Sequence, residues 1–194
     1  SPFLTDTEKL PLDPSQQQAY KAYAIEECQR SRALYALIKT RDPEFMRRLE
    51  PEFVASTQFV TSVLDLSPGE DRLWNEVIHS KRRRQIQNGY KLNPVFEMGR
   101  EDLLNDFYSV FVETQTRLGT PVHSRRYFEE ILKYHPEAQF MVGRVDHRPV
   151  AVALLLIQDQ TIFHPYTGTL RAFHGSYINC TLYWEIVKYE IGRA

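Results

Sequence analysis

The residues with the clearest chemical potential are four consecutive cations, Lys81, Arg82, Arg83 and Arg84, which we call the cationic run. They follow a helical pattern in which the apolar side chains share one face at 100° per residue: Leu73, Trp74, Val77 and Ile78. The same projection places Lys81 and Gln85 in the middle of that face. A buried ammonium without a partner is costly, so we expect an anion beside it, either a carboxylate of the protein or a phosphate of a ligand.

The other cations of the run occupy different positions on this projection. Arg82 flanks the apolar face, Arg84 lies near its opposite border, and Arg83 points away from it. If an anionic ligand binds, Lys81, Arg82 and Arg84 are candidates to contact its phosphate, because Arg is a forked donor and Lys a point charge. The alternative is a solvated helix face whose cations are favoured by the helix dipole near the C-terminal end. The sequence leaves both interpretations open.

Two histidines, His164 and His174, are candidates for a general base, because an unperturbed imidazole titrates near neutral pH. The alternative is a structural role, which is the usual one for a lone histidine in aromatic surroundings. Ser176, His174 and Asp159 form no recognisable arrangement for nucleophilic catalysis. No histidine pair at helical spacing and no cysteine pair occurs in the sequence, so no metal site is predicted.

The composition is that of a folded globular protein without a global electrostatic preference. The 194 residues are 42% hydrophobic, and 24 basic and 25 acidic residues give a net charge of -1. This balance excludes attraction of the whole molecule to nucleic acid or membrane. Cys28 and Cys180 are too few for a disulfide framework, which favours a reducing compartment. The longest apolar run, 150–157, is too short to span a bilayer as a helix, and residues 1–4 do not resemble a signal peptide, so a cytoplasmic location is predicted.

Periodicity and turn signals predict a mixed α+β organisation. The first part of the chain should contain a helix from Asp13 and Pro14 to about Arg32, then a strand at 34–38, a helical turn at 45–49 and one or two strands at 58–66. A central helix capped by Ser67 should follow and end near Leu92. The remaining elements are predicted as helices at 103–118, from Ser124 to Pro136 and from about Asn179, and as strands at 95–98, 139–145, 149–157 and 161–167. Short links make the last three strands antiparallel neighbours.

From residue 95 onward this order of elements resembles that of a GCN5-related N-acetyltransferase (GNAT) domain. The motifs that sharpen the resemblance are Lys81-Arg82-Arg83-Arg84-Gln85-Ile86, Phe107-Tyr108, Leu118-Gly119-Thr120-Pro121-Val122, Phe128, Pro149-Val150-Ala151-Val152-Ala153 and the segment 179–184. Together they look like the FemAB-like acyltransferases, in particular the branch associated with exosortase and PEP-CTERM exopolysaccharide systems. The likeness covers about residues 73–194. It implies a GNAT-like fold of the α+β class, with a mixed, mostly antiparallel sheet flanked by helices.

The resemblance also implies a domain organisation, because family members have two tandem GNAT-like domains. Residues 1–66 would be the C-terminal part of the first domain, 67–94 a connecting basic helix, and 95–194 the second domain without its last strands. We therefore expect the chain to be a fragment of a longer product, and the lack of an initiating Met points the same way. Gly89 stands where the family usually has Ala, and Asn93 where it usually has Gly, which affects helix geometry more than chemistry.

The activity implied by the resemblance is acyl transfer. FemAB proteins move aminoacyl groups from charged tRNA to a peptidoglycan precursor, so the implied partners are an anionic donor (aminoacyl-tRNA or acyl-CoA) and an envelope precursor. Tyr166, Tyr177 and Asn179 lie near where the donor would bind, although Asn179 also fits the N-cap of the last helix. Gly168 and Gly175 do not match the glycine-rich loop with which acetyltransferases bind coenzyme A, which weakens the case for that cofactor.

Our first hypothesis is a FemAB-like acyl or aminoacyl transferase of cell-envelope, peptidoglycan or exopolysaccharide biosynthesis. A second is a nucleic-acid-binding module that uses the cationic run, with an affinity that falls steeply as salt rises. A third is a noncatalytic remnant of the GNAT fold whose pockets are incomplete. The sequence does not predict the oligomeric state.

Overall fold

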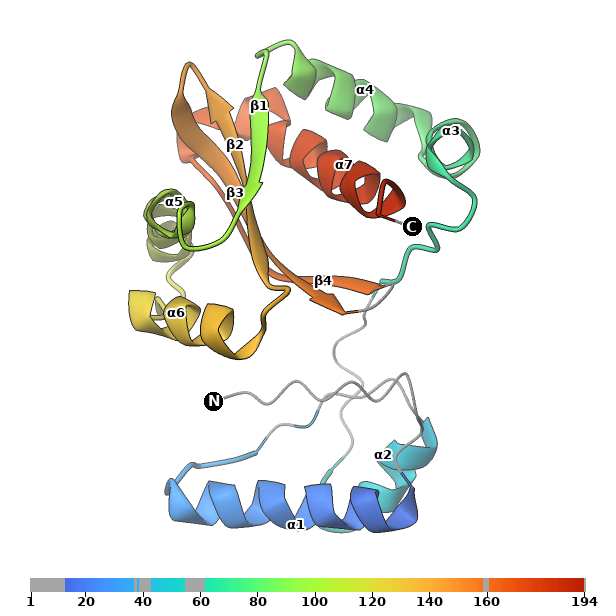
Figure 1. Cartoon of the computed structure of the whole chain (residues 1–194), viewed down its shortest axis with the longest axis vertical. Coiled ribbons are helices and arrows are strands. Elements are labelled where there is room, and N and C mark those ends of the chain that lie inside the picture. Colours follow the sequence, from blue (N-terminus) through green and yellow to red (C-terminus); the bar gives the residue numbers. More distant parts are fainter. Residues whose placement is uncertain (1–12, 37, 39–42, 55–61, 159–160, 194) are drawn as a thin grey trace. The chain divides into compact units, whose positions relative to one another are not determined.

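The computed structural model describes residues 13–36, 38, 43–54, 62–158 and 161–193. The chain divides into two compact units, Ser1–Val63 and Leu64–Ala194, and each is described by itself (Figure 1). This division lies close to the predicted boundary between residues 66 and 67. What each unit represents as a domain stays a prediction.

The first unit contains two described helices, both of which the sequence predicted. α1 (Pro14–Arg30) begins with a capping box, in which the Asp13 side chain accepts from the Gln16 N–H and the Gln16 side chain accepts from the Asp13 N–H. α2 (Pro43–Leu49) buries Phe45. Local cap chemistry is therefore sufficient to fix where α1 begins.

The strands predicted before residue 67 are wrong wherever the structure describes them. Residues 34–36 form no strand, and the Leu34 side chain is 99% exposed. Residues 62–66 form no strand either, while residues 37 and 58–61 lie outside the described residues. A short apolar run indicates a strand only if a neighbouring strand can pair with it, and periodicity does not report that partner.

The second unit is built on a four-stranded antiparallel sheet with the strand order β1-β2-β3-β4. Its strands are β1 (Val95–Gly99), β2 (Gln139–Val145), β3 (Arg148–Gln158) and β4 (Thr161–Thr169). The meander predicted from alternating residues is thus confirmed, and so is the α+β fold class. β4 pairs with β3 and has no second strand neighbour within the described ranges.

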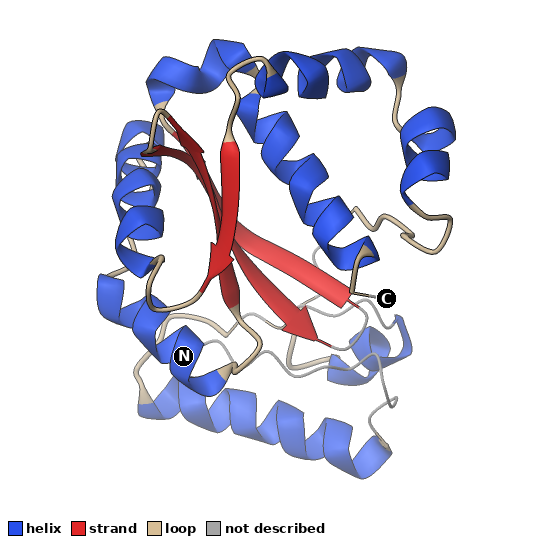
Figure 2. Ribbon diagram, turned by 45° about the horizontal axis from the view of Figure 1, so that its top comes forward, coloured by secondary structure: helices blue, strands red, loops and turns tan. Residues whose placement is uncertain are grey.

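Helices cover both faces of this sheet, as Figure 1 and Figure 2 show. α5 (Leu104–Leu118) and α6 (Arg125–Tyr134) lie on one face and α7 (Ile178–Ile191) on the other. α4 (Ser80–Tyr90) packs on α7 and forms a further layer. The main core lies between the sheet and α5, where four buried phenylalanines meet at its centre: Phe107, Phe111, Phe128 and Phe140.

The central helix is broken, which contradicts the continuous helix predicted to about Leu92. A short α3 (Glu70–Arg72) leads into a π-helical turn, η1 (Leu73–Val77), and Ile78 then adopts an extended conformation with ψ of 115°. α4 begins only at Ser80, where the His79 ring accepts from the Lys81 N–H at 3.3 Å. A π-turn and an extended residue change the angular relation between the helical segments on either side of them, so the 100° projection does not extend from Val77 to Lys81.

α4 approaches α7 closely at Gly89. A Cβ atom at Gly89 would lie 2.0 Å from Thr181 Oγ1, and this hydroxyl donates to the Ile86 carbonyl at 3.0 Å. Glycine thus allows a helix contact that the sequence alone treated only as a cost to helix stability. Asn93, after the end of α4, has φ of 49°, a left-handed conformation that Gly adopts most easily and Asn tolerates.

Candidate functional site

Arg83 of the cationic run was predicted to point away from the apolar face, and the structure shows it pointing inward. Its Nη1 donates to three carbonyl oxygens at the end of the π-turn, those of Trp74 at 2.9 Å, Asn75 at 3.1 Å and Ile78 at 2.6 Å. These carbonyls have no helical partner at a terminus, so the guanidinium satisfies them. Arg83 is therefore structural.

Arg82 lies at a cavity of about 320 Å³ between α4 and α7, which we call the α4/α7 cavity. Its Nη1 donates to the buried Cys180 thiol at 3.0 Å. Most of the lining is apolar or aromatic, and the lining residues are Leu64, Ile78, Arg82, Ile86, Asn179, Cys180, Tyr183, Trp184 and Val187. One charged group in a mainly apolar concavity is a common composition for a ligand site.

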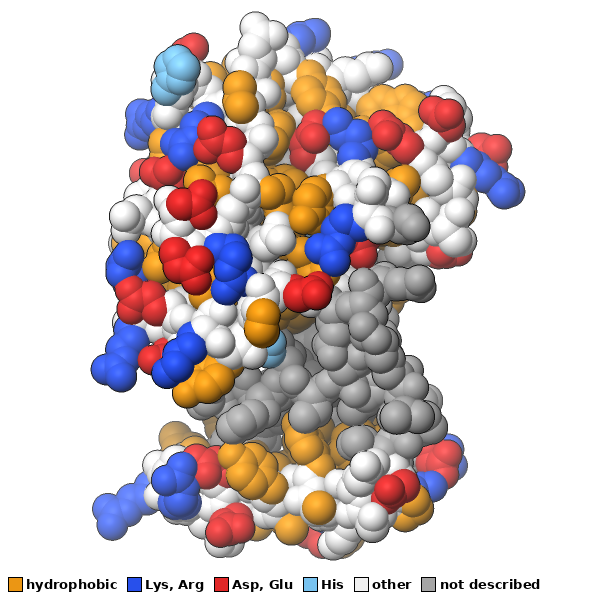
Figure 3. Space-filling view, in the orientation of Figure 1, with side chains coloured by type: hydrophobic (Ala, Val, Ile, Leu, Met, Phe, Trp, Pro, Cys, Tyr) orange, Lys and Arg blue, Asp and Glu red, His pale blue; other side chains and the backbone are white. Residues whose placement is uncertain are grey.

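The remaining cations, Lys81 and Arg84, are exposed as Arg82 is, but they do not line the α4/α7 cavity. The prediction that Lys81 sits in the middle of a buried face is wrong, because that face was projected across the break at Ile78. Gln85 does face α7, with its Oε1 3.9 Å from the Cys180 thiol. Figure 3 shows basic and acidic side chains interspersed over the visible face of the second unit rather than collected into one basic patch.

Asn179 and Tyr177 lie at the start of α7, as expected, but the N-cap is not the residue that the sequence indicated. The N-cap is Tyr177, with φ of 63° and no side-chain capping bond, so Asn179 is not the cap. Asn179 lies in the first helical turn and lines the α4/α7 cavity. Tyr183, one turn further on, shares a hydrogen bond of 3.3 Å with Thr167 of β4 and so joins the cavity wall to the edge strand.

A bulge in β4 divides its side chains between the two faces of the sheet. Leu154 pairs with Tyr166 and Leu156 with Phe163, so two residues of β4, His164 and Pro165, stand opposite one residue of β3. Tyr166 consequently packs under α5 and α6. The His164 ring instead lies 5.2 Å from the Tyr183 ring of α7.

Tyr166 belongs to a cluster that sequence reasoning missed, which we call the His123 cluster. His123 Nε2 lies 3.0 Å from Tyr166 Oη, and Tyr127 Oη lies 3.2 Å from the same hydroxyl. Tyr108 donates to the His123 carbonyl at 3.2 Å. Burial, followed by the hydrogen bond between Tyr166 and Tyr127, raises the pKa of Tyr166, so its phenol keeps its proton at neutral pH.

The structure does not bring the two predicted bases into this cluster. His174 is exposed in the 3-10 helix η2 (Arg171–Ser176), with Nε2 3.1 Å from the Thr169 carbonyl. His164 is exposed on the opposite face of the sheet from Tyr166. The only sequence signal for His123 was its place in the link between two amphipathic helices, four residues before Tyr127.

The described residues include no group of three or more His, Cys, Asp or Glu side chains arranged to hold a metal ion. The same residues include no helix with the length and apolarity needed to cross a bilayer.

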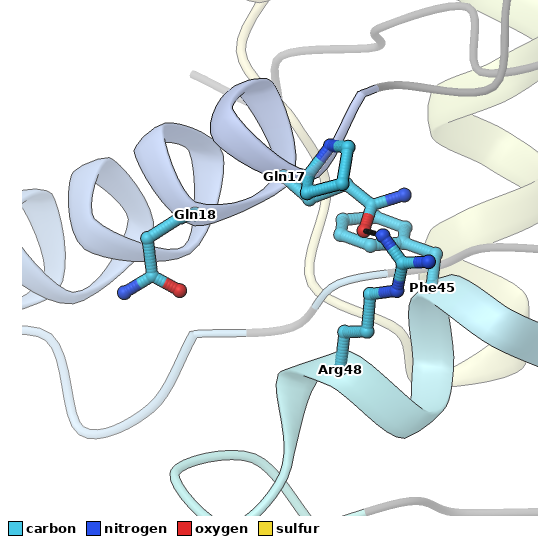
Figure 4. Close-up of a pocket in the computed structure, with 5 residues that line it drawn as sticks. Gln17, Gln18, Phe45 and Arg48 are labelled. Carbon is cyan, nitrogen blue, oxygen red and sulfur yellow. Dashed lines mark hydrogen bonds between the residues drawn. The ribbon is translucent and has the colours of Figure 1, made fainter.

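A cavity of about 420 Å³ in the first unit is lined by Pro14, Gln17, Gln18, Phe45 and Arg48. Figure 4 shows Gln17 and Arg48 pointing toward one another, and Arg48 Nη1 donates to Gln17 Oε1 at 2.8 Å. The polar groups there bind each other, so we place the candidate site in the second unit.

Comparisons with known proteins agree with this architecture. The chain is similar to the crystal structure of FemX, with a TM-score of 0.66, 12% identity, and coverage of 96% of this chain and 71% of that one. It also aligns with a functionally unknown conserved protein from Staphylococcus epidermidis, with a TM-score of 0.40, 16% identity, and coverage of 54% of this chain and 43% of that one. A search of curated protein sequences gave no match. The model of the acetyltransferase (GNAT) domain matches residues 77–193, more than half of the chain, and the chain therefore belongs to the GNAT acetyltransferase domain family.

Proposed function

We propose that this protein is a FemAB-like transferase that moves an acyl or aminoacyl group from an activated, anionic donor to a nucleophile of a cell-envelope precursor in the cytoplasm. The observation that carries the proposal is the Arg82 guanidinium at the α4/α7 cavity, in a domain of the GNAT family. Arg82 is exposed, but a phosphate that binds it from within the adjoining concavity would lose part of its water, which strengthens the attraction relative to a cation on an open surface.

The chemistry requires little from the protein beyond positioning. An amine or hydroxyl attacks the acyl carbonyl carbon, and the catalyst holds the two reactants in line and stabilises the developing oxyanion. The cavity meets β4 through the bond between Tyr183 and Thr167. A donor whose phosphate lies at Arg82 and Asn179 would therefore have its acyl end directed toward the edge of β4.

Among anionic donors we favour aminoacyl-tRNA over acyl-CoA. The segment that precedes α7 is the 3-10 helix η2, and its single glycine is Gly175. Gly168 lies within β4, where an added Cβ would lie 3.0 Å from Thr114 Oγ1, so that glycine serves packing. A backbone cradle for a pyrophosphate needs several free N–H groups in a glycine-rich loop, which this segment lacks.

The finer assignments rest on the sequence motifs. The motif Gly119-Thr120-Pro121-Val122 supports the branch associated with PEP-CTERM exopolysaccharide systems. The proposed domain plan keeps residues 1–66 as the end of a first GNAT-like domain, 67–94 as a connecting segment and 95–194 as a second domain.

The test measures donor binding and acyl transfer in the same variants. Alanyl-tRNA and acetyl-CoA are compared as donors, with a peptidoglycan precursor that carries a free amine as acceptor. Arg82→Ala should raise the Kd of the productive donor by about 10- to 100-fold, because a hydrogen bond to a charged group contributes about 1.5–3 kcal/mol. Arg84→Ala, the matched control outside the cavity, should change the Kd by less than about twofold.

Two outcomes would overturn the proposal. Equal effects of Arg82→Ala and Arg84→Ala on donor binding would remove the α4/α7 cavity as the donor site. If the protein transfers no acyl group but binds an unrelated RNA duplex with a steep salt dependence, the nucleic-acid-binding hypothesis replaces the transferase.

A further inference from the structure

The His123 cluster lies on the face of the sheet opposite the α4/α7 cavity. His123 is exposed, and it nevertheless contacts residues of three elements. The His123 ring stacks on the Tyr127 ring with centroids 4.4 Å apart and an interplanar angle of 20°. Its backbone is held by the hydroxyl of Tyr108, and its Nε2 by the hydroxyl of Tyr166. Three different elements, α5, α6 and β4, therefore fix one imidazole.

The second member of the pair, Tyr166, is fixed as firmly. Its ring makes edge contacts with Phe111 and Phe128, with centroids 5.6 Å away in each case. It stands next to the β4 bulge, on the strand that borders the proposed path of the donor. Its hydroxyl faces His123 and Tyr127 rather than the core.

We infer that His123 and Tyr166 form a proton relay that takes a proton from the nucleophile of the acceptor, an inference that rests on the proposed acyl transfer. A purely structural link between α6 and β4 would need only the half-buried phenol of Tyr166, or an apolar residue in its place. An exposed imidazole whose Nε2 lies 3.0 Å from that phenol adds a general base that is open to water.

The step balances without a further reactant. The nitrogen or oxygen of the acceptor attacks the acyl carbonyl carbon, and the bond from that carbon to the donor oxygen breaks. The proton of the nucleophile passes to Tyr166 Oη as the proton of Tyr166 passes to His123 Nε2. The exposed imidazolium then returns a proton to water, and water protonates the departing oxygen.

The surroundings favour this direction of transfer. Burial raises the pKa of Tyr166, so the phenol is protonated at rest. In the His123 tautomer with a lone pair on Nε2, this phenol donates to the ring across the 3.0 Å contact. The described titratable groups in contact with His123 are Tyr108, Tyr127 and Tyr166, and all three carry a phenol rather than a carboxylate or an ammonium.

The relay is tested by single-turnover transfer from saturating alanyl-tRNA to the amine-bearing precursor. His123→Gln and Tyr166→Phe should each slow transfer by about 100-fold or more, the range of general acid–base catalysis, while the Kd of alanyl-tRNA stays within about twofold. Arg82→Ala should instead raise the Kd of alanyl-tRNA, so the two kinds of variant differ in whether donor binding changes. His147→Gln in the exposed β2–β3 turn and Tyr134→Phe on α6 are matched controls that should transfer at the wild-type rate.

A further variant separates catalysis from a structural link. Imidazole added to His123→Ala should restore much of the rate, because His123 is exposed and its space opens to solvent. Wild-type rates in His123→Gln and Tyr166→Phe would overturn the relay and leave the proposed function standing. A lowered melting temperature in His123→Ala without rescue by imidazole would replace the relay by a structural link. Absence of transfer by the wild-type protein with either donor would overturn the proposed function and the relay together.

Discussion

The two faces of the sheet in the second unit are packed in different ways. On the α5/α6 face, Phe107 stacks on Phe140 at 4.4 Å and meets Phe128 edge-on at 5.0 Å. On the α4/α7 face, a separate small core of Leu73, Ile86, Cys180 and Trp184 adjoins a cavity with a cation beside it. The difference indicates that one face supplies a rigid support and the other supplies room for a ligand.

Both faces nevertheless use an arginine to satisfy carbonyls at the end of a helical segment. Arg100 donates to the Leu132 carbonyl at 2.8 Å and the Ala138 carbonyl at 2.7 Å, around the end of α6. Arg83 does the same for the π-turn that precedes α4. The α4/α7 face therefore has a cavity, while the π-turn beside it is held by the hydrogen bonds of Arg83.

The largest expected effect comes from the rigid face. Phe107→Ala should lower the free energy of unfolding by about 3–5 kcal/mol, because Phe107 is fully buried against three other rings and leaves a cavity that cannot collapse. Ile86→Ala on the other face should cost about 2 kcal/mol, the low end for such truncations, because its space opens onto a cavity that already exists. Urea denaturation of both variants measures the difference.

Exposed Leu118 at the end of α5 provides the control for these truncations. Leu118→Ala should change the free energy of unfolding by no more than about 0.5 kcal/mol. If Ile86→Ala proves as costly as Phe107→Ala, the α4/α7 face is packed as tightly as the other, and the comparison fails.

An intermediate effect is expected at the border of the α4/α7 face. Arg83→Ala should cost about 1.5–3 kcal/mol, because three carbonyl oxygens lose a charged donor. Arg84→Ala, one residue later and exposed, should stay within about 0.5 kcal/mol. Thermal and urea unfolding measure both, and equal values for the two variants would show that the π-turn does not depend on Arg83.

The fold of the second unit was largely predictable because its elements carry local signals. Alternation marks β2, β3 and β4, and Ser124 caps α6 as expected, its side chain accepting from the Tyr127 N–H. The prediction of one central helix failed because the break at Ile78 carries no proline, glycine or loss of periodicity. Only the contacts of Arg83 and the packing on α7 show why the chain turns there.

The candidate site was predictable only in part. Arg82 and Asn179 were named from sequence and do line one cavity, although Asn179 was also assigned a capping role that Tyr177 fills. His123 was missed because its partner, Tyr166, lies 43 positions away and faces it only through the β4 bulge. A one-residue irregularity in register decides which side of a sheet a side chain occupies, and periodicity does not locate it.

The smallest expected effect tests how closely α4 and α7 approach at Gly89, the position that sequence reasoning treated as a simple helix penalty. Gly89→Ala should gain about 1 kcal/mol of helix propensity but lose about 1–3 kcal/mol to overpacking against Thr181, for a net loss near 1 kcal/mol. Adding Thr181→Ala removes the oxygen at 2.0 Å, so the double variant should be more stable than the sum of the two single effects by about 1 kcal/mol in urea denaturation. Gly175→Ala, where an added Cβ meets nothing within 4 Å, is the matched control without overpacking. If Gly89→Ala stabilises the protein and shows no coupling to Thr181, then α4 and α7 can move apart at Gly89. The space for a ligand between the two helices would then extend beyond the α4/α7 cavity.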